Sequence, residues 1–165
     1  MADELAEVER RADLDLLTYV GLVAPALNEL VIDRLAERGF EGVKTSHGYV
    51  VQQLLHGEPT IGALATALGI TQQGASKQVL DLERLGYAER VSVVGDQRQK
   101  AVRLTARGRE MVEVTRAVRR DLERRVVRRA SRERVDHAKD VMAVLFDVLD
   151  LWGPVGQHAV PPPRD

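Results

Sequence analysis

The chain has 165 residues, of which 44% are hydrophobic and 30% charged, which suits a folded globular protein and argues against disorder over most of its length. The absence of cysteine excludes disulfides, thiol redox sensing, thiolate metal sites and a cysteine nucleophile. The net charge of −1 hides an uneven distribution, because residues 1–40 hold nine acidic and four basic residues whereas residues 71–109 hold eight basic and four acidic ones, so the middle of the chain could face phosphates.

The N-terminal part is expected to form one long helix. Apolar residues recur at helical spacing over residues 14–38, which predicts an amphipathic helix. Pro25 interrupts this pattern, and since a proline inside a helix costs about 3 kcal/mol, we expect a bend or a helix start there. Gly39 and Gly42 are expected to end the segment.

The same region sets our expectation about location. Residues 1–15 are charged and lack the apolar run of a secretory signal. No stretch approaches the roughly 20 apolar residues that are needed to span a bilayer. We therefore expect a cytoplasmic protein that has no membrane partner.

Short helices follow in the middle of the chain. Thr45 or Ser46 is expected to cap a helix that Gly57 ends, and Thr60 is expected to cap a shorter helix over residues 61–68.

A helix-turn-helix and a hairpin are expected next. Gly69 permits the turn, and Thr71 caps a further helix that ends at Gly86, a position suited to a left-handed residue. Residues 88–104 then change to strand periodicity around a polar loop at residues 95–98, which predicts a two-stranded hairpin.

The C-terminal part is expected to contain two more helices. Thr105 starts a long helix, Ser131 breaks it, and a final helix continues to Trp152. The predicted fold is mainly α with a small β-hairpin wing, built as a winged helix-turn-helix with a helical dimerisation region from both termini. The predicted divisions are residues 1–44 (N-terminal dimerisation helix), 45–108 (DNA-binding domain), 109–152 (C-terminal dimerisation helices) and 153–165 (flexible tail).

Polar side chains gather at the start of the second helix of the helix-turn-helix. They are suited to the major groove of DNA, because glutamine can pair with adenine, serine can contact several bases and lysine can reach guanine or phosphate. The alternative is an ordinary polar surface. The predicted DNA-binding residues of this helix are Thr71, Gln72, Gln73, Ser76 and Lys77.

The predicted hairpin tip carries a second candidate contact. Arg98 can enter a narrow minor groove, where the negative potential is enhanced, and Asp96 can fix the arginine or the turn through a hydrogen bond. The alternative is a surface ion pair worth less than about 1 kcal/mol.

Short motifs follow one another in a fixed order between residues 60 and 108. They are Leu64-Ala65, Leu68-Gly69-Ile70, Ser76-Lys77, Leu82-Glu83, Leu85-Gly86, Asp96-Gln97-Arg98 and Leu104-Thr105-Ala106-Arg107-Gly108. In this order and spacing they resemble the winged helix-turn-helix of MarR-type regulators. The resemblance implies that Gln72, Gln73, Ser76 and Lys77 face bases and phosphates and that Asp96 and Arg98 form the wing pair. Gln97 and Gly74 depart from the family pattern, which leaves affinity and operator preference open.

The resemblance also implies how such a protein works. We expect a homodimer on a pseudo-palindromic operator, with half-sites about 10 base pairs apart, acting as a repressor of transcription, with activation as the alternative. Many such regulators release DNA when a small aromatic acid binds between the dimer helices and the winged domain. Tyr19, His47 and Tyr49 are the candidate ligand-binding residues, with packing or interhelix hydrogen bonding as the alternative.

Other kinds of function are less well supported by the sequence. The four histidines are scattered, so we expect no metal, and we expect no cofactor. An enzyme is not expected, since we find no glycine-rich phosphate loop, no nucleophile elbow and no compact carboxylate pair. The alternative function is a winged-helix protein-interaction module without specific DNA binding.

The arginine-rich run over residues 116–134 is compatible with extra phosphate contacts, with pairing to the acidic first helix of a partner subunit, or with ordinary solvated helix faces.

Overall fold

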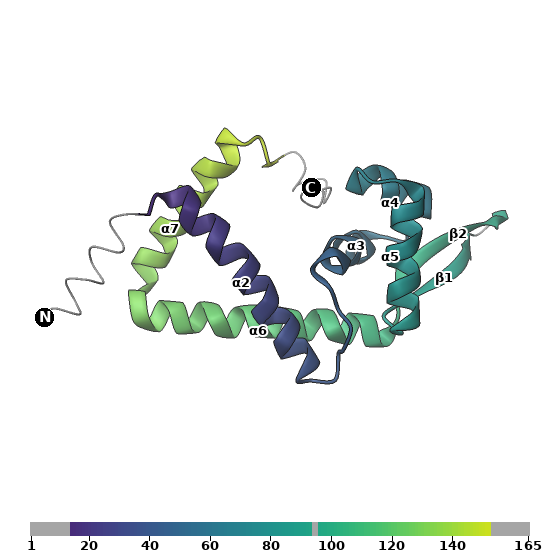
Figure 1. Cartoon of the computed structure of the whole chain (residues 1–165), viewed down its shortest axis with the longest axis horizontal. Helices are drawn as coiled ribbons and strands as arrows, with labels where there is room; N and C mark the ends of the chain where they lie inside the picture. The colour runs from purple at the N-terminus through teal and green to yellow at the C-terminus, as the bar shows by residue number, and fades with distance from the viewer. Residues whose placement is uncertain (1–13, 94–95, 153–165) are drawn as a thin grey trace, which may run out of the picture.

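The computed structural model describes residues 14–93 and 96–152, with the side chains of residues 93–99 outside that description. The predicted order of elements is confirmed: helices with one antiparallel hairpin. The long helix α6 runs along the molecule, with the winged helix-turn-helix near one end, α7 at the other, and α2 crossing it (Figure 1). The elements are α2 (Leu16–Ala36), α3 (Thr45–His56), α4 (Ile61–Leu68), α5 (Gln72–Arg84), β1 (Ala88–Val93), β2 (Asp96–Leu104), α6 (Ala106–Ala130) and α7 (Arg132–Val148).

Helix α2 begins before the proline, not at it. Asp15 caps the helix by accepting a hydrogen bond from the Thr18 backbone N–H at 2.9 Å. The helix then continues through Pro25, so the alternative of a helix start there is wrong. Pro25 has no backbone N–H, so the Gly21 carbonyl lacks its usual helical hydrogen bond. Because Gly21 is exposed, water can donate a hydrogen bond to this carbonyl instead.

Helix α2 also corrects the expectation about apolar stretches. It is 21 residues long, and a window of it reaches a mean hydropathy of 1.4, which is long and apolar enough to cross a membrane on those two criteria. Helices of soluble proteins meet the same criteria, and Val31 and Leu35 of α2 lie in the protein core. The finding is therefore weak evidence for a membrane span.

The helix-turn-helix is formed by the capping residues that the sequence indicates. Thr60 and Thr71 accept hydrogen bonds from backbone N–H groups at the starts of α4 and α5, at 3.2 and 3.0 Å. Gly69 between the helices has φ +63°, the left-handed conformation that a glycine adopts without steric cost. Gly86 ends α5 with φ +76°, and the Tyr87 N–H reaches back to the Leu82 carbonyl at 2.9 Å.

The cap of α3 differs from the prediction. Lys44 is the N-cap residue, with extended φ −118° and ψ 157°, so the expectation of Thr45 or Ser46 is wrong. The His47 side chain stabilises this helix start in another way, because its Nδ1 accepts a hydrogen bond from the Lys44 backbone N–H at 3.2 Å. A histidine at the third helical position thus does what a glutamate or glutamine commonly does.

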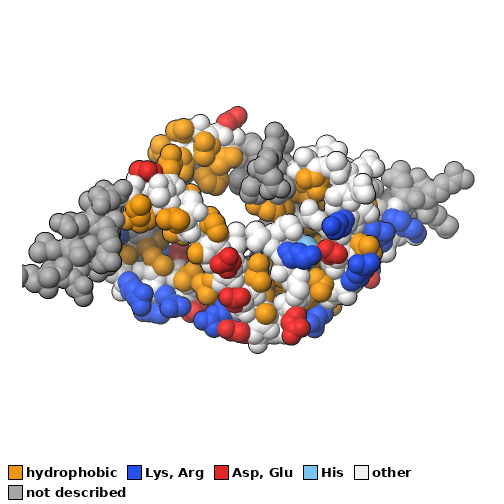
Figure 2. Space-filling view, in the orientation of Figure 1, with side chains coloured by type: hydrophobic (Ala, Val, Ile, Leu, Met, Phe, Trp, Pro, Cys, Tyr) orange, Lys and Arg blue, Asp and Glu red, His pale blue; other side chains and the backbone are white. Residues whose placement is uncertain are grey.

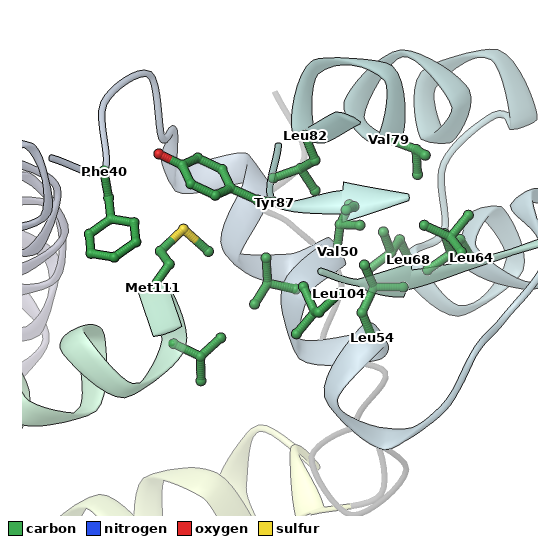
Figure 3. Packing of buried hydrophobic residues seen from close by; sticks show 14 of the residues in the cluster. Phe40, Val50, Leu54, Leu64, Leu68, Val79, Leu82, Tyr87, Leu104 and Met111 are labelled. Atoms are coloured by element: carbon green, nitrogen blue, oxygen red, sulfur yellow. The ribbon is translucent and has the colours of Figure 1, made fainter. Parts of the chain in front are cut away.

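One hydrophobic core joins the helix-turn-helix to α2 and α6. Leucines and valines of α3, α4 and α5 pack together, and Phe40, Tyr87 and Met111 extend the cluster toward α6 (Figure 3). Val31 and Leu35 of α2 are 6% and 2% exposed, so part of α2 belongs to the same core.

Arg107 fastens the loop after α2 to the first turn of α6. Its Nη2 donates a hydrogen bond to the Gly39 carbonyl at 2.6 Å, and its guanidinium lies 5.2 Å from the centre of the Phe40 ring. The Tyr87 hydroxyl donates to the Glu41 carbonyl of the same loop at 3.0 Å. These contacts couple the position of α2 to that of the winged domain.

The hairpin is more irregular than predicted. Ala88 pairs with Leu104 and the ladder continues to Ser92 and Lys100, after which the register shifts so that Val93 faces Asp96. Asp96 to Arg98 therefore belong to β2, so placing them in the loop was wrong. A shift of this kind leaves extra residues of one strand unpaired, a feature that hydrophobic alternation does not encode.

Candidate nucleic-acid interface

Helix α5 presents a polar N-terminal surface opposite a buried stripe. Ala75, Val79 and Leu82 are each 0% exposed and fix the helix against the core. The cap residue Thr71 is exposed, as are Gln72, Gln73 and Lys77, and Ser76 is half-buried. The structure therefore places all five residues predicted on this helix together, around its first two turns.

Two ion pairs hold the later turns of α5. Asp81 Oδ2 lies 3.1 Å from Lys44 Nζ at the start of α3, and Glu83 Oε2 lies 3.5 Å from Arg90 Nε in β1. The hydrogen bond from Lys44 lowers the pKa of Asp81. Helix α5, the second helix of the helix-turn-helix and the predicted recognition helix, is thus tied both to α3 and to the wing.

The wing carries basic side chains near the recognition helix. Lys100 Nζ donates to Ser92 Oγ at 2.8 Å across the hairpin, and Arg103 pairs with Glu89 at 2.8 Å. Blue basic side chains lie at the end of the molecule that holds α5 and the hairpin (Figure 2). The predicted wing pair, Asp96 and Arg98, lies in β2 by its backbone, and its side chains fall outside the described residues.

A cavity of about 300 Å³ lies between α2, α3 and α6. Its polar lining includes Lys44, His47, Arg116 and Arg119, and none of its lining residues is acidic. His47 is 1% exposed, and burial lowers its pKa, followed by the nearby Lys44 charge. Its apolar lining consists of Val31, Ile32, Leu35, Val43, Val51, Leu55, Met111 and Val112.

The predicted ligand-binding residues do not all meet at this cavity. His47 lines it, whereas Tyr19 and Tyr49 are not among its lining residues. Tyr19 is at the exposed surface of α2, and Tyr49 packs against the hydrophobic core.

The sequence reasoning missed Lys44 and did not single out Arg116 or Arg119 as cavity residues. The two arginines belong to a run whose many arginines made individual positions indistinguishable.

Apolar side chains remain exposed on the terminal helices. Hydrophobic residues gather over α2 and α7 (Figure 2). On α2 the exposed set is Leu16, Leu17, Tyr19, Leu22 and Val23, and at α7 and just beyond it the set is Val141, Val144, Val148, Leu149 and Trp152.

Among the residues that the structure describes, no cluster of three or more histidine or carboxylate side chains is placed to hold a metal ion.

The central region of the chain is similar to a known family. Residues 41–99 match a family model described as the MarR family. The fold resembles that of MepR of Staphylococcus aureus, a transcription regulator of the multidrug efflux pump MepA, with 19% identity and a TM-score of 0.64 over 82% of this chain and 99% of that one. A DNA complex of MepR matches with 20% identity and a TM-score of 0.63, over 81% and 97% of the two chains. The YusO protein of Bacillus subtilis matches with 18% identity and a TM-score of 0.64, over 89% and 98%. No curated protein sequence matches this chain.

Proposed function

We propose that this protein is a MarR-type transcriptional regulator that binds duplex DNA as a homodimer through α5 and the β1–β2 hairpin. The match of residues 41–99 to the MarR family model supports this proposal. The observation that carries the proposal is the two-sided α5, whose apolar face is fully buried while Gln72, Gln73 and Lys77 stay exposed at its start. A related fold is known in complex with DNA, as the MepR structure shows for that protein. No enzymatic activity is part of the proposal.

The contacts to DNA divide into two groups. Gln72, Gln73 and Ser76 enter the major groove and read base edges, while Lys77 contacts guanine or phosphate and Thr71 supports the helix start. Arg98 enters the adjacent minor groove, and Asp96 positions it. The assigned residues of α5 and its cap, Thr71, Gln72, Gln73, Ser76 and Lys77, lie outside the hydrophobic core, as side chains that contact DNA must.

Dimerisation is proposed to use the terminal helices. The exposed apolar side chains of α2 and α7 include Leu17 at 62%, Leu22 at 62% and Val148 at 74% exposure. Contiguous exposed apolar surface of this kind is unfavourable in water and is typically covered by a partner. A second copy with two-fold symmetry covers both faces at once and places two α5 helices in successive major grooves, with half-sites about 10 base pairs apart. Residues 1–44 and 109–152 then form the dimerisation region, and residues 45–108 bind DNA.

The regulator is proposed to act as a repressor that a small aromatic acid releases. The cavity between α2, α3 and α6 supports this proposal, since it combines an apolar wall with basic groups and no acidic one. The ring of such an acid would contact the apolar lining residues, and its carboxylate would pair with Lys44, Arg116 or Arg119.

Selection of binding sites from random duplexes tests the proposal. The expected result is an enriched pseudo-palindrome that wild type binds more tightly than unselected DNA. Lys77→Ala should weaken binding by removing a cation at the groove, whereas Arg84→Ala, which removes an exposed cation from the last turn of the same helix, should bind as wild type does. If no sequence is enriched, the chain is better explained as a winged-helix protein-interaction module.

A further inference from the structure

Lys44 lies between the cavity and the recognition helix. Lys44 is one of the residues that line the cavity, and its Nζ lies 3.1 Å from Asp81 Oδ2 on α5. Asp81 is not among the residues that line the cavity. The same lysine therefore borders the cavity and contacts, through its ammonium group, the helix that would read DNA.

The backbone of Lys44 is held in place, whereas its side chain can move to a different hydrogen-bond partner. Its backbone N–H is held by His47 Nδ1 at 3.2 Å, and its own carbonyl accepts the His47 N–H at 3.0 Å. His47 is buried, so this end of α3 is fixed. The side chain, in contrast, is 63% exposed and can change its partner without a change in the helix.

The charges around the cavity favour an anion. Lys44, Arg116 and Arg119 are the charged residues that line it, and no acidic residue is among its lining residues. Arg116 is engaged by Glu113 at 2.6 Å on its own helix, and Lys44 is engaged by Asp81. A carboxylate that enters the cavity therefore offers Lys44 a second acceptor.

We propose that Lys44 is a coupling residue for which Asp81 and an anionic ligand compete, so that ligand binding weakens the contact that holds α5 against α3. This inference rests on the proposed effector site. Because coupling between two sites is reciprocal, loss of the Lys44–Asp81 contact strengthens ligand binding by the same factor by which ligand binding loosens that contact. The pair is partly exposed, and exposed ion pairs are weak, so the factor is about two to five.

Asp81→Asn tests the coupling, because it removes the competing charge and leaves every cavity residue in place. Glu83→Gln is the matched control: it neutralises an acid on the same helix whose partner, Arg90, lies in the wing and not at the cavity. The probe is benzoate, with benzamide as its uncharged counterpart, titrated calorimetrically into each full-length variant. DNA affinity is then measured with and without saturating benzoate, after thermal melts have established that the variants fold.

The expected result is that Asp81→Asn binds benzoate about two to five times more tightly than wild type, while Glu83→Gln binds it as wild type does. In wild type, the DNA affinity should be higher without benzoate than with it. The ratio of these two affinities should be closer to one in Asp81→Asn, and unchanged in Glu83→Gln. If benzoate binds wild type and Asp81→Asn equally and the ratio is unchanged, the coupling is refuted while the effector site stands. If wild type does not distinguish benzoate from benzamide, the anionic effector site itself is refuted together with the coupling.

Discussion

Gly108 is the position where the packing predicts the clearest response to one methyl group. It lies in the first turn of α6, where an added Cβ would overlap the Tyr87 carbonyl oxygen and lie 2.9 Å from the Tyr87 carbonyl carbon. Both neighbours are backbone atoms, so no side chain can rotate to make room. The same carbonyl accepts the Thr105 N–H at 3.1 Å, and a backbone shift would weaken that bond as well.

The change in the free energy of unfolding for Gly108→Ala is the sum of opposing effects. Overpacking costs about 1–3 kcal/mol, and the weakened hydrogen bond costs up to about 1 kcal/mol more. Alanine recovers up to about 1 kcal/mol through its higher helix propensity. Gly108→Ala should therefore lower the free energy of unfolding by about 1–3 kcal/mol.

Gly48→Ala is the control for Gly108→Ala, since Gly48 lies inside α3 and an added Cβ there meets nothing within 4 Å. It should stabilise the protein by roughly 0.5–1 kcal/mol through helix propensity alone. Urea unfolding of both variants, followed by circular dichroism at one protein concentration, measures the difference. A Gly108→Ala variant as stable as wild type would show that α6 does not approach Tyr87 as closely as the structure places it.

Three further predictions concern other residues. Burial lowers the pKa of His47, so the unfolded chain takes up a proton near pH 6.5 that the folded protein resists, and stability should fall as pH drops below that value. His47→Gln, whose amide oxygen can still accept the Lys44 N–H, should lose less stability between pH 7.5 and 5.5 by thermal melting, and an equal loss would contradict this account. Ser131 has φ +87° and ψ 157°, so Ser131→Gly should raise the free energy of unfolding by about 1 kcal/mol, and destabilisation would show that the cap at Arg134 outweighs the backbone strain. Arg107→Lys should lower the free energy of unfolding by about 1 kcal/mol, because lysine lacks the planar group that contacts Phe40 and Gly39 together. Wild-type stability of this variant would mean that the contact is not needed to hold the loop.

The local features of the fold could be predicted from the sequence, because each depends on a few neighbouring residues. Thr60 and Thr71 as caps, Gly69 in the turn and Gly86 after α5 follow from the hydrogen-bonding and conformational preferences of those residue types. The polar face at the start of α5 follows from helical periodicity in the same way.

The features that were missed join distant segments or depend on unusual partners. Lys44 and Asp81 are 37 residues apart, and nothing in either neighbourhood indicates that they meet. The cavity is made by α2, α3 and α6 together, so its lining cannot be read from any one of them. The histidine cap of α3 replaces a more common residue pattern, and the register shift in the hairpin depends on strand pairing, which composition does not specify.

The most direct test of the central claim is the salt dependence and stoichiometry of binding to the selected duplex. The account predicts one dimer on two half-sites about 10 base pairs apart, with an affinity that falls linearly on a log–log scale as salt rises, because each neutralised phosphate releases counterions. It also predicts that the slope of log affinity against log salt concentration is shallower for Lys77→Ala than for wild type, by about one if Lys77 contacts a phosphate. Binding of a single monomer, or an affinity independent of salt, would contradict it.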